Sequence, residues 1–327
     1  MKAIVYSRYG GPDVLQVAEI ERPTAGPNEV LVRVHAAALN PVDWHFVRGT
    51  PFPIRMATGG LRRPSHQRRI GGDYAGTIAA AAPGVTEFVV GDPVFGMGHG
   101  SLAEYLTVRA DQVVRKPERV TFEQAAGVPL AGLTALQMLR DTAHVRASQH
   151  VLIVGAAGGI GTFAVQLAKS FGAQVTGVQS TGVVDLVRSL GADRTIDYTQ
   201  EDFTAGDARY DAVLDNVSNR ELPDVLRVVK PGGTLVPNGG GSPTKGLSIR
   251  RIVRLLAIRP FIPQKIRLFV TKPNRADLQM LADLIQAGTL TPVLDRCYPL
   301  ADAADALRHL ESGHAHGKIV ITVAPRA

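Results

Sequence analysis

The chain has 327 residues, a net charge of +7 and 45% hydrophobic residues, a composition typical of a soluble α/β protein. This length predicts about two domains with ample core. The single cysteine, Cys297, excludes a disulfide framework and a cysteine-rich zinc site. No apolar run reaches the ~18 residues of a membrane span, and the first residues do not resemble a signal peptide. We therefore expect a cytoplasmic protein.

Residues 1–124 alternate short apolar stretches with turn signals. Pairs of Gly and Pro, such as Gly26-Pro27 and Pro83-Gly84, mark the turns. Strands are expected at Ala3–Tyr6, Glu29–Ala37, Asp73–Ala80, Pro93–Gly96 and Glu104–Val108. Short strands at this spacing predict a compact, barrel-like β domain.

Residues 125–272 alternate strands with helices. The strands are expected at Val151–Val154, Gln174–Val178, Arg194–Asp197, Ala212–Asp215 and Thr234–Pro237. The helices are expected at Thr162–Phe171, Val183–Leu190 and Leu222–Val229. This order predicts an α/β fold with a Rossmann-type, doubly wound parallel sheet, whose ligand lies beyond the carboxyl ends of the strands. A sixth strand is expected at Arg267–Thr271, at a sheet edge that a second subunit could pair with.

Residues 273–327 are expected to return to the first domain. They predict two helices with an extended segment between them and a final strand, at Arg275–Ala287, Leu290–Tyr298, Ala301–Glu311 and Lys318–Val323.

Basic residues are unevenly placed along the chain. Eleven Lys or Arg and no acid lie between Val225 and Ala276. Part of this stretch, Ser248–Ile258, predicts a basic amphipathic helix that docks on its own protein, the commoner role, contacts a membrane surface or covers a substrate pocket. No nucleic-acid partner is expected, because no recognisable binding module is present. A second acid-free cluster comprises Arg55, Arg62, Arg63, Arg68 and Arg69.

The segment Val151–Gln166, VLIVGAAGGIGTFAVQ, combines a buried strand, a glycine-rich turn and the start of a helix. Gly155, Gly158 and Gly161 permit a tight turn and bring the backbone close to a pyrophosphate. The N-terminus of the helix then points its N–H groups and its dipole at the phosphates. We interpret this segment as a dinucleotide site.

The residues after the second strand indicate which dinucleotide is bound. An NAD site expects an acid about 20 residues past the glycines, to bind the ribose hydroxyls. Here Gln179, Ser180 and Thr181 occupy that place, and hydroxyls can donate to a 2′-phosphate that a carboxylate would repel. NADPH is therefore favoured. NADH use stays open, because Gly182 and Val183 follow instead of a basic residue.

Sequence stretches that span nearly the whole chain match one family in its order. They include ALNPVDWHFVRG, GGDYAG, PGVTEFVVGDPVFG, LAEY, SLGADRTIDYTQEDF, YDAVLDNV and HAHGKIVITV. On these stretches the chain resembles the zinc-free medium-chain dehydrogenases/reductases, in the branch of quinone oxidoreductases and alkenal/one double-bond reductases. The resemblance implies a GroES-like substrate domain of residues 1–124 and 273–327, a Rossmann NAD(P)-binding domain of residues 125–272, a cleft between them and a homodimer.

Zinc alcohol dehydrogenases of this superfamily carry a Cys near position 40 and a Gly-His-Glu near position 72. Asn40 and Gly72-Asp73 stand there in this chain, so we expect no metal. Without that Lewis acid, hydride transfer to a quinone or an α,β-unsaturated carbonyl remains feasible. The protein then needs orientation and hydrogen-bond donors for the carbonyl oxygen.

The resemblance implies three catalytic candidates, and each has a structural alternative. Asn40 either holds a substrate oxygen or a cofactor amide, or forms a turn with Pro41. Asp43 orients the loop or contacts the cofactor ribose, or alternatively caps a helix. Tyr74 either donates to an enolate or packs in the core.

The resemblance also implies the cofactor contacts. Backbone N–H groups of Gly158, Gly159, Ile160 and Gly161 are expected at the pyrophosphate. Ser180 and Thr181 are expected at the 2′-phosphate, with Tyr198 beside it or the adenine. Asn216, Val217, Gly239 and Gly240 are expected at the nicotinamide end. Thr134 and Lys318 are expected to approach the cofactor, although an exposed strand lysine is an equal alternative for Lys318.

These observations predict a zinc-independent, NADPH-dependent oxidoreductase that transfers hydride to a quinone or an α,β-unsaturated carbonyl. The alternative is an NAD(P)H-binding sensor or scaffold with little catalytic activity, in contact with a membrane surface. Its support is the lack of an indispensable acid or base, together with the basic helix predicted at 248–258.

Overall fold

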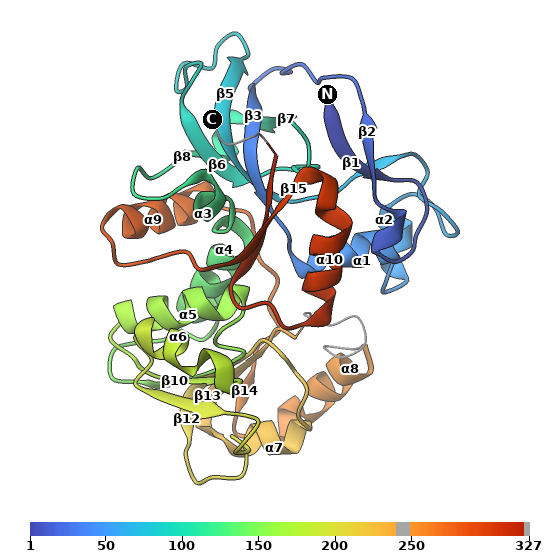
Figure 1. Ribbon diagram of the computed structural model, residues 1–327. Coiled ribbons are helices and arrows are strands. Elements are labelled where there is room, and N and C mark those ends of the chain that lie inside the picture. The colour runs from blue at the N-terminus through green and yellow to red at the C-terminus, as the bar shows by residue number, and fades with distance from the viewer. Residues whose placement is uncertain (240–248, 324–327) are drawn as a thin grey trace. The chain divides into compact units, whose positions relative to one another are not determined.

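A computed structural model describes residues 1–239 and 249–323 of the chain. The chain forms two compact units, unit 1 with Met1–Leu133 and Pro273–Ala327 and unit 2 with Thr134–Lys272 (Figure 1). Unit 1 extends beyond residue 124, the boundary predicted from the sequence. Helix α3 (Phe122–Ala126) packs on strands of unit 1, and the backbone N–H of Leu130 donates to Asp73 of the same unit.

Unit 1 is built on two sheets in the described residues. The larger has seven strands in the order β15-β16-β3-β5-β6-β8, with β7 also paired to β3. Their bounds are Leu294–Pro299 (β15), Lys318–Thr322 (β16), Glu29–Ala38 (β3), Asp73–Ala81 (β5), Pro93–Met97 (β6), Val113–Arg115 (β8) and Tyr105–Arg109 (β7). The smaller has the order β2-β1-β4, with bounds Gln16–Glu19 (β2), Lys2–Tyr6 (β1) and Arg68–Arg69 (β4).

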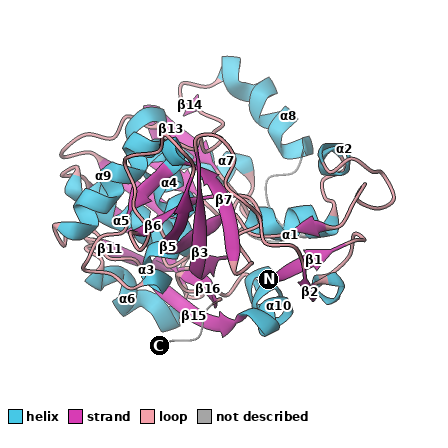
Figure 2. Cartoon of the chain, turned by 90° about the horizontal axis from the view of Figure 1, so that it is seen from above, coloured by secondary structure: helices cyan, strands magenta, loops and turns pink. Residues whose placement is uncertain are grey.

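The long strand β3 shows why this sequence forms a sheet. Its β-branched residues Val30, Val32 and Val34 are buried and belong to the core of unit 1, whereas Arg33 between them is exposed. Figure 2 shows α10 (Ala303–Ser312) beside β15 and β16, and Leu307 of this helix adds to the same core.

Unit 1 also contains helices that sequence periodicity did not reveal. These are α1 (Pro41–Arg48), α2 (Pro53–Ala57) and α4 (Pro129–Gln137), which begins at the end of the unit. The short helices α1 and α2 start at prolines, which read in the sequence as turn signals but also suit a first helical turn. Helix α9 (Arg275–Gln286) was expected; short 3-10 turns complete the unit at Pro12–Val14, Ala110–Gln112 and Leu300–Asp302.

Unit 2 has a parallel sheet of six strands in the order β11-β10-β9-β12-β13-β14. In sequence order this is 3-2-1-4-5-6, the arrangement of dinucleotide-binding doubly wound folds. The bounds are His150–Val154 (β9), Gln174–Gln179 (β10), Arg194–Asp197 (β11), Tyr210–Asp215 (β12), Val229–Pro237 (β13) and Lys265–Ile266 (β14). The predicted fold class, an α/β chain with a Rossmann-type sheet beside a β-rich part, is confirmed.

The helices of unit 2 connect these strands. They are α5 (Gly159–Ser170), α6 (Val184–Ser189), α7 (Leu222–Arg227) and α8 (Ile249–Ile258), with single turns at Met138–Thr142, Thr181–Val183 and Arg259–Phe261. Helix α5 begins three residues before the predicted Thr162. The backbone bond from Thr162 N to Gly158 O already closes the first helical turn over the glycines.

The sixth strand corrects a prediction. It is the two-residue β14, Lys265–Ile266, and not Arg267–Thr271. Pairing with β13 joins Thr234 to Lys265 and Leu235 to Ile266, and a last bond runs from Arg267 N to Leu235 O. Residues 267–270 continue beyond that bond without a strand partner in the described chain.

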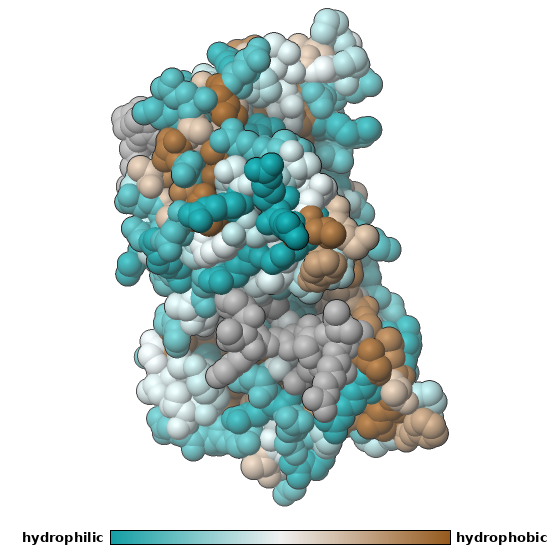
Figure 3. Space-filling model, turned by 90° about the vertical axis from the view of Figure 1, so that its right-hand side faces the viewer, coloured by the Kyte–Doolittle hydropathy of each residue, from teal (hydrophilic) through white to brown (hydrophobic). Residues whose placement is uncertain are grey.

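On the face drawn in Figure 3, hydrophobic side chains lie in separate groups among hydrophilic ones. Within residues 1–239 and 249–323, no helix has both the length and the apolar character that crossing a bilayer requires.

Candidate functional site

Three strand ends meet at one edge of the larger sheet of unit 1. Strand β3 ends at Ala38, and its antiparallel neighbours place Asp73 opposite Ala38 on one side and Val320 opposite Ala38 on the other. Asn40, just after β3, therefore comes close to Asp73 at the start of β5 and Lys318 at the start of β16. These residues are more than thirty positions apart in the chain, and only the strand register brings them together.

The side chains at this edge form a buried hydrogen-bond network. Lys318 Nζ donates to Asn40 Oδ1 at 2.5 Å and to Leu39 O at 3.1 Å, and it lies 3.6 Å from Asp73 Oδ2. Asn40 Nδ2 donates to the same Asp73 oxygen at 2.9 Å. Asp73 is 0% exposed and Lys318 is 4% exposed, so these charges are shielded from water.

Three hydrogen bonds with backbone groups fix this network to the starts of α4 and α1. Asp73 Oδ1 accepts from the N–H of Leu130, in the first turn of α4, at 3.2 Å. Asp43 Oδ2 accepts from Asn40 N at 2.7 Å, and Asp43 N donates back to Asn40 O at 2.9 Å. Asp43 thus has the capping role that the sequence left as an alternative. We call Asn40, Asp43, Asp73 and Lys318 the Lys318 network.

Burial shifts the pKa values of the ionisable groups in the Lys318 network. Desolvation raises the pKa of Asp43 to about 7, although its hydrogen bond from Asn40 N opposes the rise. Desolvation also raises the pKa of Asp73, and the Lys318 ammonium counteracts this. The pKa of Lys318 is lowered by desolvation, against the attraction of Asp73 and Asp43. Each buried charge therefore depends on its partners.

Tyr74 lies next to Asp73 but on the opposite face of β5. Its side chain is 0% exposed and belongs to the hydrophobic core of unit 1. Its hydroxyl has no hydrogen-bond partner among the described residues, and burial raises the pKa of the phenol. This placement favours the core alternative for Tyr74 over proton donation to an enolate.

In unit 2, the glycine-rich turn follows β9 as predicted. Gly155 has φ +76°, a conformation that favours glycine, and Gly158 N donates to Gly155 O. A Cβ on Gly161 would lie 2.1 Å from Gly155 O, so only glycine lets α5 start this close to the turn. A Cβ on Gly158 would meet Gly155 O alone, at 3.4 Å, which leaves the backbone of the turn open on that side.

These observations fit a dinucleotide diphosphate. Gly158 is the N-cap of α5 without a capping side chain, so the first N–H groups of the helix, from Gly159 to Gly161, are free of side-chain acceptors. An anion suits that position because of the helix dipole and these N–H groups.

The ends of β12 and β13 lie beside the same turn. A Cβ on Gly155 would lie 2.9 Å from Val217 Cγ2 and 3.7 Å from Asn216 Cβ. Asn216 Nδ2 donates to Val154 O at the end of β9, and Gly239, after β13, packs against Ser218. The structure thus brings Asn216 and Val217 to the glycine turn and Gly239 to Val217 and Ser218, whereas Gly240 lies outside the described residues.

The end of β10 carries the residues assigned to the adenosine. Thr181 Oγ1 donates to Asp197 Oδ2 at 2.5 Å and shares a 3.0 Å hydrogen bond with Thr199. The bond from Thr181 is the largest contribution that lowers the pKa of Asp197, which therefore stays a carboxylate. Tyr198 beside it is 49% exposed and accessible to a ligand.

Gln179 at the end of β10 is an additional candidate. It is buried, and neither its Oε1 nor its Nε2 has a hydrogen-bond partner in the described part of the chain. Orphaned buried amides are rare, which is consistent with a polar ligand at this strand end. Thr134 is buried as well, and its hydroxyl shares a 2.6 Å hydrogen bond with Thr271.

Sequence reasoning did not select Asp73, Asp197 or Gln179 as site residues. An aspartate between Gly72 and an apolar strand was a visible signal for Asp73, since such a position is usually buried. For Asp197 the signal was an acid at the end of a predicted strand neighbouring Ser180 and Thr181. Gln179 stood in the sequence at the place of the expected acid, but its missing partners appear only in three dimensions.

The comparisons with known proteins agree with this geometry. Residues 26–118 match the family model described as alcohol dehydrogenase GroES-like domain, and residues 190–321 match the one described as zinc-binding dehydrogenase. An NADPH-dependent alkenal/one oxidoreductase of Arabidopsis thaliana is 34% identical over 99% of this chain and 80% of that protein. The chain belongs to the medium-chain dehydrogenase/reductase superfamily.

Solved quinone oxidoreductases are among the structures to which the chain is similar. The quinone oxidoreductase of Coxiella burnetii has a TM-score of 0.87 and 30% identity, with 99% of both chains covered. The Escherichia coli quinone oxidoreductase complexed with NADPH has a TM-score of 0.83 and 25% identity, covering 99% of this chain and 100% of that one.

One family description mentions zinc, so the side chains of this medium-chain dehydrogenase/reductase must be compared with those that bind zinc. Where zinc members are expected to hold their metal, Asn40 and Asp73 here surround the ammonium of Lys318. An amide, one carboxylate and a cation do not make a zinc ligand set. Across residues 1–239 and 249–323, no three His, Cys, Asp or Glu side chains are grouped to hold a metal ion.

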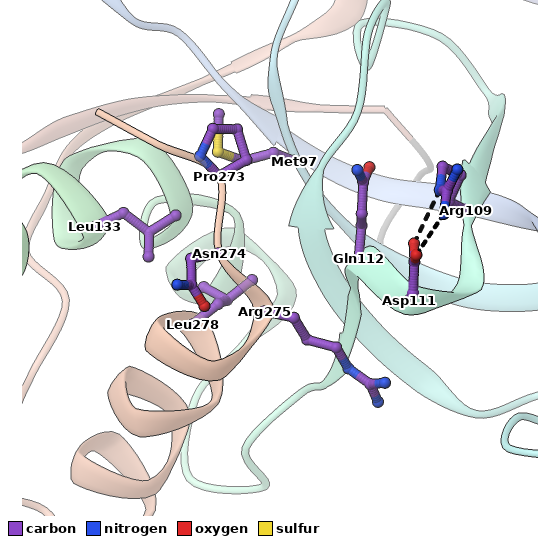
Figure 4. A pocket seen from close by; sticks show the side chains of 9 residues that line it. All are labelled: Met97, Arg109, Asp111, Gln112, Leu133, Pro273, Asn274, Arg275 and Leu278. Atoms are coloured by element: carbon purple, nitrogen blue, oxygen red, sulfur yellow. Dashed lines mark hydrogen bonds and ion pairs between the residues drawn. The ribbon is translucent and has the colours of Figure 1, made fainter. Parts of the chain in front are cut away.

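A pocket of about 320 Å³ lies elsewhere in unit 1 of this medium-chain dehydrogenase/reductase (Figure 4). Its charged walls are neutralised, because Arg109 pairs with Asp111 at 2.5 Å and Arg275 pairs with Glu87. None of the predicted site residues lines it. The lining residues are Met97, Arg109, Asp111, Gln112, Leu133, Pro273, Asn274, Arg275 and Leu278.

Proposed function

We propose that this chain is a zinc-independent oxidoreductase that uses NADPH to reduce a quinone or an α,β-unsaturated carbonyl. The observation that carries the proposal is the glycine turn after β9, where Gly161 permits the close start of α5. The names of the relatives, an alkenal/one oxidoreductase and quinone oxidoreductases, support both acceptor classes. The relative with NADPH in its name and the NADPH-complexed structure support the cofactor.

When bound, the nicotinamide supplies the hydride. The chain contributes the means to hold it: N–H groups of Gly159, Ile160 and Gly161 for the diphosphate and the hydroxyls of Ser180 and Thr181 for the adenosine end. Negative charge then develops on the carbonyl oxygen of the acceptor, and fixed donors or cations stabilise it. Water can complete the reaction with a proton, so no buried acid is required.

Within unit 1, the Lys318 network acts by positioning. Both polar atoms of the Asn40 amide are engaged, Oδ1 by Lys318 and Nδ2 by Asp73. Lys318 Nζ likewise directs its hydrogens to Asn40 and Leu39. We therefore assign Asn40, Asp43 and Lys318 to fixing the turn between β3 and α1, with the ammonium adding a positive charge at the place of the absent zinc.

Acceptor-dependent oxidation of NADPH, followed by its absorbance, tests the proposal. The panel contains 1,4-benzoquinone, 9,10-phenanthrenequinone, methyl vinyl ketone and 2-hexenal, with the saturated ketone and alcohol as controls. We expect turnover with a quinone or an enone and none with the saturated compounds. Binding of NADPH with no turnover across the panel would favour a sensor or scaffold instead.

A homodimer is part of the proposal. Strand β14 is the edge of the parallel sheet in the described residues, and the extended residues after it have no strand partner there. Val270 in this segment is 81% exposed and Leu268 is 42% exposed. An apolar, unpaired edge of this kind suits pairing with a second copy. Light scattering should give twice the chain mass, and Val270→Lys should lower it toward the monomer.

We also propose the cytoplasm as the location, although the relatives include a chloroplastic protein. Cell fractionation of the tagged chain tests it. The sequence also suggested that the basic helix predicted at Ser248–Ile258 contacts a membrane. Part of that segment lies outside the described residues, because Ser248 is not among them.

A further inference from the structure

The segment between Asp43 and Asp73 contains no acidic residue and six arginines. Four of these arginines either have hydrogen-bond partners or are exposed to solvent. Arg48 forms a bidentate pair with Glu311, and Arg55 donates to the carbonyls of Gly49 and Leu61. Arg62 and Arg63 are exposed. Arg68 and Arg69, the two residues of β4, remain.

These two arginines are only partly exposed, and neither forms an ion pair in the described part of the chain. Strand β4 holds them by pairing with β1, with Arg69 opposite Val5 and Arg68 opposite Tyr6. Arg68 donates from Nη1 to Thr58 O at 3.5 Å and hydrogen-bonds the Tyr6 side chain, and neither partner is a carboxylate. Two consecutive residues of one short strand thus carry guanidinium groups that have no ion-pair partner in the described residues.

His99 belongs to the same cluster. The Arg69 side chain runs across Gly100, since a Cβ there would lie 2.8 Å from Arg69 Nε. Desolvation lowers the pKa of His99, and the positive charges of Arg68 and Arg69 lower it further. Desolvation lowers the pKa of Arg69, with no carboxylate opposing it. Tyr6 on β1 faces Arg68 and also the buried Asp43 of α1, whose carboxylate already accepts from Asn40 N.

A partly desolvated cation without a counter-charge, as Arg69 is, is costly unless an anion joins it. Guanidinium forks bind carboxylate and phosphate oxygens with paired N–H donors, and an imidazole N–H can add a third donor. We propose that Arg68, Arg69 and His99 form a binding site for a carboxylate or phosphate group carried by the acceptor. The role of the acceptor rests on the proposed function; anion binding itself does not.

The placement within unit 1 supports this assignment. Gly71, two residues after Arg69, donates a backbone hydrogen bond to Asp43 of the Lys318 network. Gly98, next to His99, donates from its N–H to Gly72 O at 2.7 Å. The anion site therefore adjoins the turn that the Lys318 network fixes, so an anionic tail would hold an acceptor beside it.

A matched pair of acceptors tests the site. We use 4-oxo-2-pentenoate, an enone with a carboxylate, and its neutral methyl ester. The wild type should favour the carboxylate in kcat/KM, and Arg69→Gln should lower that value about tenfold or more for the carboxylate only. Arg69→Lys should retain part of the preference. Arg62→Gln, an exposed arginine of the same segment, is the control and should change neither value.

Calorimetric titration without NADPH gives a readout independent of turnover. The carboxylate and inorganic phosphate should bind the wild type and compete, and both should bind Arg69→Gln at least tenfold more weakly. If Arg69→Gln does not fold, Arg68→Gln and His99→Asn take its place. Equal binding by wild type and variant, or equal loss for both acceptors, would overturn the site. No turnover of any acceptor would overturn the proposed function, while the titration would still decide on anion binding.

Discussion

Lys318 Nζ donates to Asn40 Oδ1 across 278 positions of the chain. This bond joins the start of β16 to the turn before α1, and it places the chain's own cation where zinc members of the superfamily are expected to hold their metal. Because Asp73 and Asp43 lie around the same ammonium, loss of Lys318 leaves these carboxyl groups buried without their cation.

Lys318→Met should therefore lower the free energy of unfolding, because it leaves the Asp73 carboxylate buried without its cation. We expect a loss of about 3–5 kcal/mol in urea unfolding. The double variant Lys318→Met with Asp73→Asn should recover part of this loss, since the unpaired charge is gone. An additive loss in the double variant would show that the two side chains do not interact.

Asp43 should make the stability of the protein depend on pH. Its pKa is raised to about 7 in the folded state, against about 3.9 in an unfolded chain. The stabilisation from the protonated form is thus complete below pH ~4 and is lost as the pH rises through ~7, by up to about 4 kcal/mol.

The side chain of Asp43→Asn cannot ionise. As the pH rises from 5 to 8, the free energy of unfolding of this variant should therefore increase relative to that of the wild type. Urea unfolding across this range measures the difference. Asp207→Asn, at an exposed position, should follow the wild type at every pH. Parallel curves for Asp43→Asn and the wild type would contradict the burial argument.

The sheet of unit 2 could be predicted because its strands are continuous apolar runs separated by regular helices. Even there, the last strand, β14, lies at Lys265–Ile266 and not at the predicted Arg267–Thr271. The bounds of a strand depend on which backbone groups find hydrogen-bond partners in the neighbouring strand. The helices α1 and α4 were missed because a proline begins each of them, and a proline alone reads as a turn.

The candidate site was predicted unevenly for a related reason. The glycine turn is local, so its spacing in the sequence revealed it. The Lys318 network is not local: Asn40 and Lys318 were selected separately, but their mutual contact and the burial of Asp73 follow from strand register. Sequence alone left Lys318 as either a cofactor contact or an exposed lysine, and the structure shows it to be 4% exposed.

Gly161 and Gly158 should respond differently to alanine. A Cβ on Gly161 would lie 2.1 Å from Gly155 O and 2.7 Å from Ala156 Cα, both backbone atoms that cannot move away cheaply. Gly161→Ala should therefore lose at least ~1–3 kcal/mol of stability in urea unfolding. Gly158→Ala meets Gly155 O only at an ordinary 3.4 Å and has φ −76°, so its stability should stay within ~1 kcal/mol of the wild type.

The same pair separates folding from cofactor binding. The methyl group of Gly158→Ala would stand on the open side of the turn, where a diphosphate approaches, so NADPH should bind at least about tenfold more weakly. Fluorescence titration of NADPH measures this with a folded protein. Normal affinity in Gly158→Ala would place the diphosphate away from this turn.

Ser180 and Asp197 should set the preference between NADPH and NADH in opposite directions. Ser180→Asp adds a carboxylate at the end of β10, where it would repel a 2′-phosphate and bind ribose hydroxyls. Its ratio of kcat/KM for NADPH over NADH should fall about tenfold. Asp197→Asn removes the carboxylate that accepts from Thr181 at 2.5 Å, so the same ratio should rise. The exposed Asp185→Asn is the matched control, since its carboxylate contacts Arg188 instead. An unchanged ratio in both variants would mean that the adenosine end binds elsewhere on unit 2.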